Sequence, residues 1–211
     1  MSQPIISPKL FKFLRDLRGN NNRDWFTENK ARYESDVKAP CVELIGELVK
    51  PLARAAPMLQ AIPKGHGGSL MRIYRDTRFS KDKTPYKTNV GISIRHQAAG
   101  AIPAPGADRP FAPQECFIGA GCWRPERNVL AAIRASIDEN PKAWKRARDN
   151  KRLRDSFNLV GESLKTSPRD YSKDHPMIDD LKRIDFIAVA PLTEKEITSD
   201  QIVDICLLYT S

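Results

Sequence analysis

The spacing of apolar side chains changes twice along this chain, and this change limits the fold more than any other feature. Apolar residues recur at helical spacing over residues 10–49, then mix with polar ones over 70–76, where Ile73 and Tyr74 favour a strand, and alternate with polar ones over 90–96. Helical spacing returns after Pro125, and a short apolar run, FIAV, follows at 186–189. This order of helices, strands, helices and a late strand predicts an α+β fold instead of repeated β-α-β units.

Cap and breaker residues divide the first helical region. Ser7, which a proline follows, predicts a helix start, and Gly19 predicts the end of that helix. Asn22 is placed to cap the next helix. Within that helix Pro40 predicts a kink or a split, and Pro51 predicts a further break.

The two expected strands, residues 70–76 and 90–96, are joined by a segment too long for a tight hairpin. Residues 77–89 must therefore form an ordered or a disordered loop. A mobile surface loop is expected at residues 98–113, which are rich in Ala, Pro and Gly. The stretch QECFIGAGC, residues 114–122, predicts a strand and then a glycine turn.

The segment RIYRDTRFSKDKTPYKT, residues 72–88, has more positive charge than its own carboxylates neutralise. It holds two aspartates, Asp76 and Asp82, and six cations. The cations are Arg72, Arg75, Arg78, Lys81, Lys83 and Lys87. Because like charges repel, the missing partner is solvent counterions, carboxylates elsewhere in the fold, or a ligand such as a phosphate.

We therefore treat this charged segment as a candidate anion site. Arginine presents a planar fork that suits carboxylate or phosphate, and lysine acts as a point charge. In this hypothesis Asp76 and Asp82 orient the cations, and Tyr86 stacks on the ligand. The alternative is an ionic network that fixes the loop over the sheet, with Phe79 and Tyr86 as hydrophobic anchors.

The stretch GAGCWRPE, residues 119–126, is a second candidate. A glycine turn before a helix exposes backbone N–H groups and the positive end of the helix dipole, and both attract anions. If the turn lies beside the charged segment, Gly119, Gly121 and Trp123 belong to the same pocket. The simpler alternative is a tight turn with Trp123 packed in the core.

A strongly basic helix is expected at residues 141–154, where seven cations accompany Asp149. These cations spread around the helix, which is typical of a solvated face; contact with nucleic-acid phosphates is the sharper alternative. The net charge of +9 attracts anions in general and does not choose among them.

The sequence does not favour metal or nucleophilic chemistry. Cys116 and Cys122 could bind zinc with one of the scattered histidines His66, His96 and His175, but their spacing matches no known cluster. The cysteines are expected to be free thiols. No nucleophile–base pair, phosphate-binding loop or dinucleotide fingerprint is found, so no metal and no cofactor is expected.

Length and composition suit one globular domain. The chain has 211 residues, of which 40% are hydrophobic and 29% are charged. We expect a single α+β domain with N-terminal helices, a small, mostly antiparallel sheet and further helices. Because the sequence has no signal peptide and no apolar run of roughly 18 to 20 residues, we expect a cytoplasmic protein without a membrane partner.

The last six residues, CLLYTS, equal the translation of TGTCTCTTATACACATCT, a transposon-end adapter of sequencing libraries. We therefore expect residues 206–211 to be an artefact and the domain to comprise residues 1–205, with its C-terminus truncated. In this interpretation Cys206 has no functional weight. The helix that starts near Thr198 then lacks its remainder.

Three motifs together resemble one known family, the domain of unknown function 2461 family of bacteria and fungi. They are the charged segment, the upstream NNRDWFTENKARYE and the downstream GAGCWRPE. The resemblance extends from Leu10 to about Ile205. It implies a single α+β domain whose final helix continues past the end of this chain, and it implies no particular reaction.

The chain departs from the family pattern at three places. After VGISIRH the family often has another aromatic strand, and this chain has the Ala- and Pro-rich stretch instead. Ala120 stands where the family usually has glycine, and Arg169 and Asp170 stand where it usually has lysine and glycine. The fold expectation is unaffected by these changes. They weaken any transfer of ligand binding from relatives to residues 98–122 or 165–175.

Two functions remain open from the sequence. The first is binding of a phosphate-bearing or other anionic small molecule in an Arg/Lys-rich pocket, with or without a catalysed reaction. The second is a non-catalytic interaction module whose basic surface contacts nucleic acid or an acidic partner. Convergence of the cations in a concave site favours the first function, and an open, flat basic face favours the second.

Overall fold

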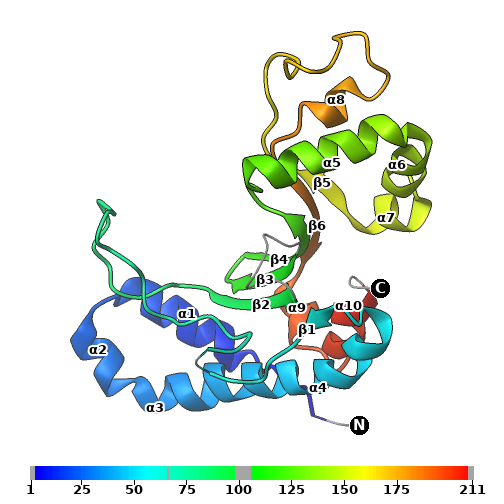
Figure 1. The fold of residues 1–211 in the computed structure, drawn as a ribbon. Helices are drawn as coiled ribbons and strands as arrows, with labels where there is room; N and C mark the ends of the chain where they lie inside the picture. The colour runs from blue at the N-terminus through cyan, green and yellow to red at the C-terminus, as the bar shows by residue number, and fades with distance from the viewer. Residues whose placement is uncertain (1–2, 66, 98–105, 209–211) are drawn as a thin grey trace. The chain divides into compact units, whose positions relative to one another are not determined.

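The computed structural model describes residues 3–65, 67–97 and 106–208 (Figure 1). Its helices and antiparallel strands confirm the predicted α+β class. The chain divides into two compact units. Unit 1 holds the described residues up to Gln97, residues 106–118 and those from Pro191 onward, and unit 2 holds residues 119–190.

Unit 1 is built mainly from helices whose buried faces form its core. One face of α1, including Leu14, and one face of α4, including Leu48, are fully buried. The helical elements are α1 (Lys9–Gly19), α2 (Arg23–Glu28), α3 (Lys30–Tyr33), the π-helical turn η1 (Glu34–Lys38), α4 (Ala39–Ala55), α9 (Glu194–Ile197) and α10 (Ile202–Leu208).

The cap predictions for these helices are confirmed in part. Asn22 caps α2, because its Oδ1 accepts a hydrogen bond from the Trp25 backbone N–H at 2.9 Å. Helix α1 ends at Gly19, as expected. The prediction for Ser7 is wrong: Pro8, already in helical conformation at φ −56° and ψ −16°, occupies the N-cap position.

The two prolines of the long helical region interrupt it less than predicted. Before Pro40 the chain forms η1, whose wider π-helical turn accommodates the missing N–H and the proline ring without ending the helical path. The break predicted at Pro51 is wrong, because α4 continues to Ala55. Leu48 and Leu52, on either side of Pro51, are buried and hold this turn against the core.

The strands of the described residues form a sheet in the order β1-β2-β3-β4-β6-β5. Strand β2 is antiparallel to both β1 and β3, and β5 is antiparallel to β6. Strands β4 and β6 each run from one unit into the other. The strands are β1 (Leu59–Gln60), β2 (Val90–His96), β3 (Gly106–Ala112), β4 (Glu115–Cys122), β5 (Asn158–Val160) and β6 (Phe186–Leu192).

Strand β2 confirms the predicted alternation, since Val90, Ile92 and Ile94 are all buried. The surface loop predicted for residues 98–113 is wrong over residues 106–112, which form β3. Backbone pairing with β2 and the complete burial of Phe111 outweigh the loop-forming composition there. Residues 98–105 of that prediction lie outside the described residues.

Unit 2 combines short helices with the ends of β4 and β6. The expected single basic helix is divided into two, because α6 ends before Asp149 and α7 begins at Lys151. Asp185, only 1% exposed, accepts backbone hydrogen bonds from Arg124 (2.8 Å) and Glu162 (2.9 Å) and so joins two turns. The helices are α5 (Arg127–Glu139), α6 (Pro141–Arg148), α7 (Lys151–Ser156) and α8 (Ile178–Leu181).

The C-terminal residues that are described are helical. Cys206 is fully buried within α10, which packs against α4. Residues 209–211 lie outside the described residues, and the adapter origin of 206–211 stays a prediction. In the described part of the chain, the helices are too short or too polar to span a membrane.

Candidate functional site

The charged segment forms an irregular hairpin, in which residues 77–89 are a loop, as predicted, but residues 70–76 are not a strand. Tyr74 pairs with Tyr86 in an isolated bridge, the Arg75 N–H donates to the Pro85 carbonyl at 2.9 Å, and the Lys87 N–H donates to the Ile73 carbonyl at 2.7 Å. The strand predicted at residues 70–76 is therefore wrong. Its polar side chains remain in water, and only isolated bridges join this stretch to its neighbours.

Aromatic rings attach the base of this hairpin to the helices of unit 1. The Tyr86 ring stacks on Phe26, with ring centroids 4.1 Å apart and planes inclined by 19°. The Tyr74 ring lies beside the same pair, with its centroid 5.5 Å from that of Tyr86. The centroids of the Phe13 and Phe26 rings are 6.5 Å apart. Since Tyr86 is only 5% exposed, its ring is a core anchor and is not available to stack on a ligand.

Asn21 provides a second attachment, which the sequence analysis missed. Its Nδ2 donates to the Tyr86 carbonyl at 2.9 Å, and its Oδ1 accepts from the Tyr86 N–H at 3.1 Å. The amide thus takes the place of a neighbouring strand. From this run of asparagines the sequence predicted only the cap at Asn22; the fold shows that Asn21 reaches the hairpin.

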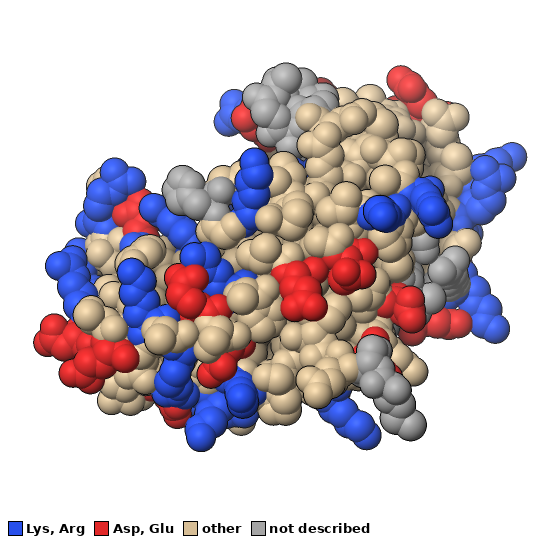
Figure 2. Space-filling view, turned by 90° about the horizontal axis from the view of Figure 1, so that it is seen from below, with Lys and Arg blue, Asp and Glu red and all other residues tan. Residues whose placement is uncertain are grey.

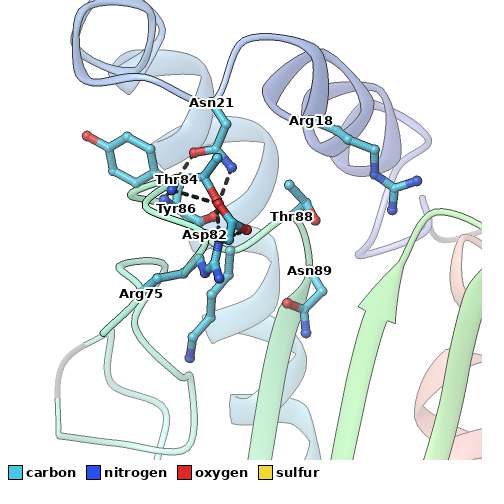
Figure 3. Close-up of a pocket in the computed structure, with 9 residues that line it drawn as sticks. Arg18, Asn21, Arg75, Asp82, Thr84, Tyr86, Thr88 and Asn89 are labelled. Atoms are coloured by element: carbon cyan, nitrogen blue, oxygen red, sulfur yellow. Dashed lines mark hydrogen bonds and ion pairs between the residues drawn. The ribbon is translucent and has the colours of Figure 1, made fainter. Parts of the chain in front are cut away.

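A cavity of about 440 Å³ lies between α1, the base of the hairpin and the residues that lead into β2. Three cations line it, Arg18, Arg75 and Lys87, against the single carboxylate of Asp82. Figure 3 shows Arg18 descending from α1 on one side and Arg75 with Asp82 on the other. Thr88 and Asn89 lie between the two sides.

Arg75 is neutralised by groups of the hairpin itself. Its Nη1 donates to both Asp82 Oδ2 and Thr84 Oγ1. Asp82 also accepts a hydrogen bond from the Thr84 backbone N–H at 2.9 Å. The pKa of the Asp82 carboxyl is lowered to about 2, and this backbone hydrogen bond is the largest cause, with the bond from Arg75 the second. The carboxylate is therefore charged at neutral pH.

The other cavity cations have no such partner. Arg18 and Lys87 form no ion pair with any described residue. The lining therefore carries an excess of two positive charges, three cations less one carboxylate. Arg18 was not predicted, because its helix lies more than fifty residues before the charged segment in the sequence.

The remaining cations of the segment lie outside this lining. Arg78 pairs with Asp76 at 2.7 Å, which lowers the pKa of that carboxyl, and Lys83 Nζ donates to the Thr77 carbonyl at 2.9 Å. Arg72 and Lys81 are exposed and form no ion pair with a described residue. The ionic network that the sequence offered as an alternative thus accounts for Arg75 and Arg78. Lys87 lies outside that network and lines the cavity.

The glycine stretch does not form the predicted turn. Gly119 and Gly121 lie inside β4, and the chain turns only afterwards, at Trp123 and Arg124. Trp123 is 70% exposed, so its expected place in the core is also wrong. These residues belong to unit 2, whereas the cavity belongs to unit 1.

One cation of the basic helices, Arg148, is neutralised by carboxylates of unit 2. Arg148 pairs with Asp149 at 2.8 Å and also with the buried Asp180. Figure 2 is a separate view, from below, in which the basic helices are not marked; on the face that it shows, Lys and Arg side chains stand singly or in small groups among Asp and Glu. This mixture of signs gives no support to a flat basic surface on that side.

Metal-binding side chains are not gathered among the described residues. Over residues 3–65, 67–97 and 106–208, no three His, Cys, Asp or Glu side chains lie together in a way that could hold an ion. Cys41, Cys116 and Cys122 are free thiols, as predicted. Burial raises the pKa of Cys41 to about 12, so this thiol stays protonated.

Fold and cavity define an α+β protein in which the base of a charged hairpin, packed on aromatic side chains of the N-terminal helices, forms one side of a cationic cavity. The profile of the family described as "Conserved hypothetical protein (DUF2461)" matches residues 9–209. The chain belongs to this family, which confirms the resemblance found in the sequence. No curated protein and no solved structure matches the chain.

Proposed function

We propose that the cavity of unit 1 binds the phosphate group of a small molecule. The observation that supports this proposal is the excess of cations around one open cavity, in which Arg18 and Lys87 have no carboxylate partner among the described residues. Cations that share a cavity repel each other, and a phosphate between them converts this repulsion into charge-assisted hydrogen bonds.

The size and polarity of the cavity indicate a ligand larger than free phosphate. About 440 Å³ is within the range of small-molecule pockets. The Thr88 hydroxyl and the Asn89 amide add neutral groups that can bind the hydroxyls of a sugar phosphate or the ribose of a nucleotide. We propose binding and assign no reaction to the cavity.

Lys87→Ala and Arg18→Ala should each weaken the binding of a phosphate monoester about tenfold or more, because each removes a charge-assisted hydrogen bond. Isothermal titration calorimetry at low salt, with a panel of sugar phosphates and nucleotides, measures the effect. Arg72→Ala is the matched control, since Arg72 is an exposed cation of the same segment outside the lining. Equal weakening by all three substitutions would show a general charge effect and contradict the proposal.

Asp82→Asn should tighten phosphate binding severalfold. The asparagine Oδ1 can still accept the Thr84 N–H, while loss of the negative charge releases Arg75 for the ligand. Asp76→Asn is the control, because Asp76 pairs with Arg78 outside the cavity. The same titrations compare the two variants, and an unchanged or weaker affinity of Asp82→Asn would contradict this role of Arg75.

A further inference from the structure

The tip of the charged hairpin, residues 77–83, exposes a large aromatic ring among cations. The charged hairpin projects beyond α1 and α2 of the same unit (Figure 1). Phe79 in this tip is 96% exposed, the most exposed of the large hydrophobic side chains in the described residues. A single exposed apolar side chain is ordinary on a protein surface, so its charged surroundings must carry the argument.

The side chains around Phe79 are held in place by local contacts. The Arg78 guanidinium lies 5.8 Å from the centre of the Phe79 ring, and two hydrogen bonds to Asp76, of 3.0 and 2.7 Å, fix its orientation. The Lys83 ammonium donates to the Thr77 carbonyl at 2.9 Å and thereby joins the two sides of the tip. The loop therefore presents its ring on an ordered base.

Positive charge is available beside the ring. Lys81 is exposed and forms no ion pair with a described residue, and Lys83 is bonded only to a neutral carbonyl. Proteins that hold unpaired nucleic-acid strands combine these two elements, an aromatic platform for a base and cations for the neighbouring phosphates.

We propose that this tip binds single-stranded nucleic acid. One base stacks on Phe79, and the phosphates on either side contact Lys81 and Lys83. The strand must be unpaired, because a base within a duplex is already stacked on both faces and cannot lie on the ring.

The residues around the tip favour a nucleic acid over a membrane surface. An anionic bilayer is a continuous negative surface, which Asp76 and Asp82 would have to approach together with Phe79. Phosphates of a single strand are discrete and flexible, so they can contact the lysines and avoid the carboxylates. Phe79 is also the single apolar side chain of residues 77–83, which gives little area for insertion into lipid.

This inference does not depend on the proposed function of the cavity. Phe79, Lys81 and Lys83 do not line the cavity, and Lys87, which does, is not part of the tip. Lys87→Ala should therefore leave oligonucleotide binding nearly unchanged, whereas Phe79→Ala should leave the binding of small phosphates unchanged. The failure of one proposal can be distinguished from the failure of the other.

Fluorescence anisotropy with a labelled oligothymidylate, measured with the full chain at low salt, tests the proposal. Phe79→Ala should weaken binding about tenfold, the effect expected for the stacking of one base. Phe79→Tyr, which keeps the ring, should bind like the unsubstituted protein. Because Phe79 is almost fully exposed, none of these substitutions removes a core contact. Leu164→Ala, at an exposed leucine of unit 2, is the matched control and should have no effect.

Phe79→Leu separates base stacking from insertion into lipid, because leucine keeps the apolar surface and lacks the ring. We expect this variant to lose oligonucleotide affinity as Phe79→Ala does. The proposal is overturned if the protein does not bind the oligonucleotide, if Phe79→Ala or Phe79→Leu binds it as tightly as the unsubstituted protein, or if the same sequence binds equally well as a duplex. It is also overturned if only vesicles of phosphatidylserine bind, with Phe79→Leu unimpaired.

Discussion

Tyr86→Ala should lower the free energy of unfolding by about 3 to 5 kcal/mol, the range found when a buried aromatic side chain is reduced to alanine. The Tyr86 ring is almost completely buried and stacks on Phe26 with centroids 4.1 Å apart. Its removal leaves a cavity beside Phe26 of α2 and Tyr74 of the hairpin. Urea denaturation followed by circular dichroism measures the change.

The same substitution should also abolish ligand binding in the cavity. The aromatic contact fixes the hairpin base from which Arg75 and Lys87 reach the lining. The two bonds of Asn21 hold only the backbone at Tyr86 and cannot by themselves keep the hairpin packed. Calorimetric titration at a temperature where Tyr86→Ala is still folded separates this effect from global unfolding.

Tyr86→Phe is the matched control, because it retains the stacked ring and removes only a hydroxyl for which no hydrogen bond is found among the described residues. Its stability should differ by less than about 1 kcal/mol, as for other replacements that keep the shape of a core side chain. If Tyr86→Phe were as damaging as Tyr86→Ala, the hydroxyl and not the ring would hold the hairpin.

Features that depend on neighbouring residues could be predicted from the sequence. The cap at Asn22 and the alternation of Val90, Ile92 and Ile94 are local patterns, and the structure confirms both. The surplus of cations in residues 72–88 was also visible. These predictions hold because a cap or a strand face is decided within a few residues.

The parts of the site that could not be predicted depend on contacts between distant segments. Arg75 has two aspartates near it in the sequence, and only the path of the hairpin decides that Asp82 is its partner while Asp76 binds Arg78. Arg18 reaches the cavity from α1 and Asn21 from the turn between α1 and α2, and no rule of residue spacing predicts this. The cationic residues of the sequence therefore indicated a site. The neutral groups that line it, and the limits of the cavity, could be identified only from the fold.

The glycine stretch shows the same limit in unit 2. A glycine before a proline-led helix is typical of a turn, and this was the prediction for Gly121. In the structure β4 continues through Gly121 at φ +136°, because the backbone of β6 approaches too closely for a side chain. The glycine serves the packing of two strands, a requirement that lies some sixty-five residues away in the sequence.

Gly121→Ala should therefore destabilise the protein by about 3 kcal/mol or more, as backbone strain and overpacking act at one position. The new Cβ would lie far inside contact distance of the Phe186 carbonyl oxygen and 3.0 Å from Ile187 Cα, and these backbone atoms cannot turn aside as a flexible side chain can. Gly19→Ala is the control: nothing lies within 4 Å of its added Cβ, and alanine favours the helix, so its stability should be unchanged or slightly higher. Thermal unfolding measured by calorimetry compares the two variants. If Gly121→Ala unfolded at the temperature of the unsubstituted protein, β4 and β6 could not approach so closely in solution, and the turn predicted from the sequence would again be the better description of residues 119–122.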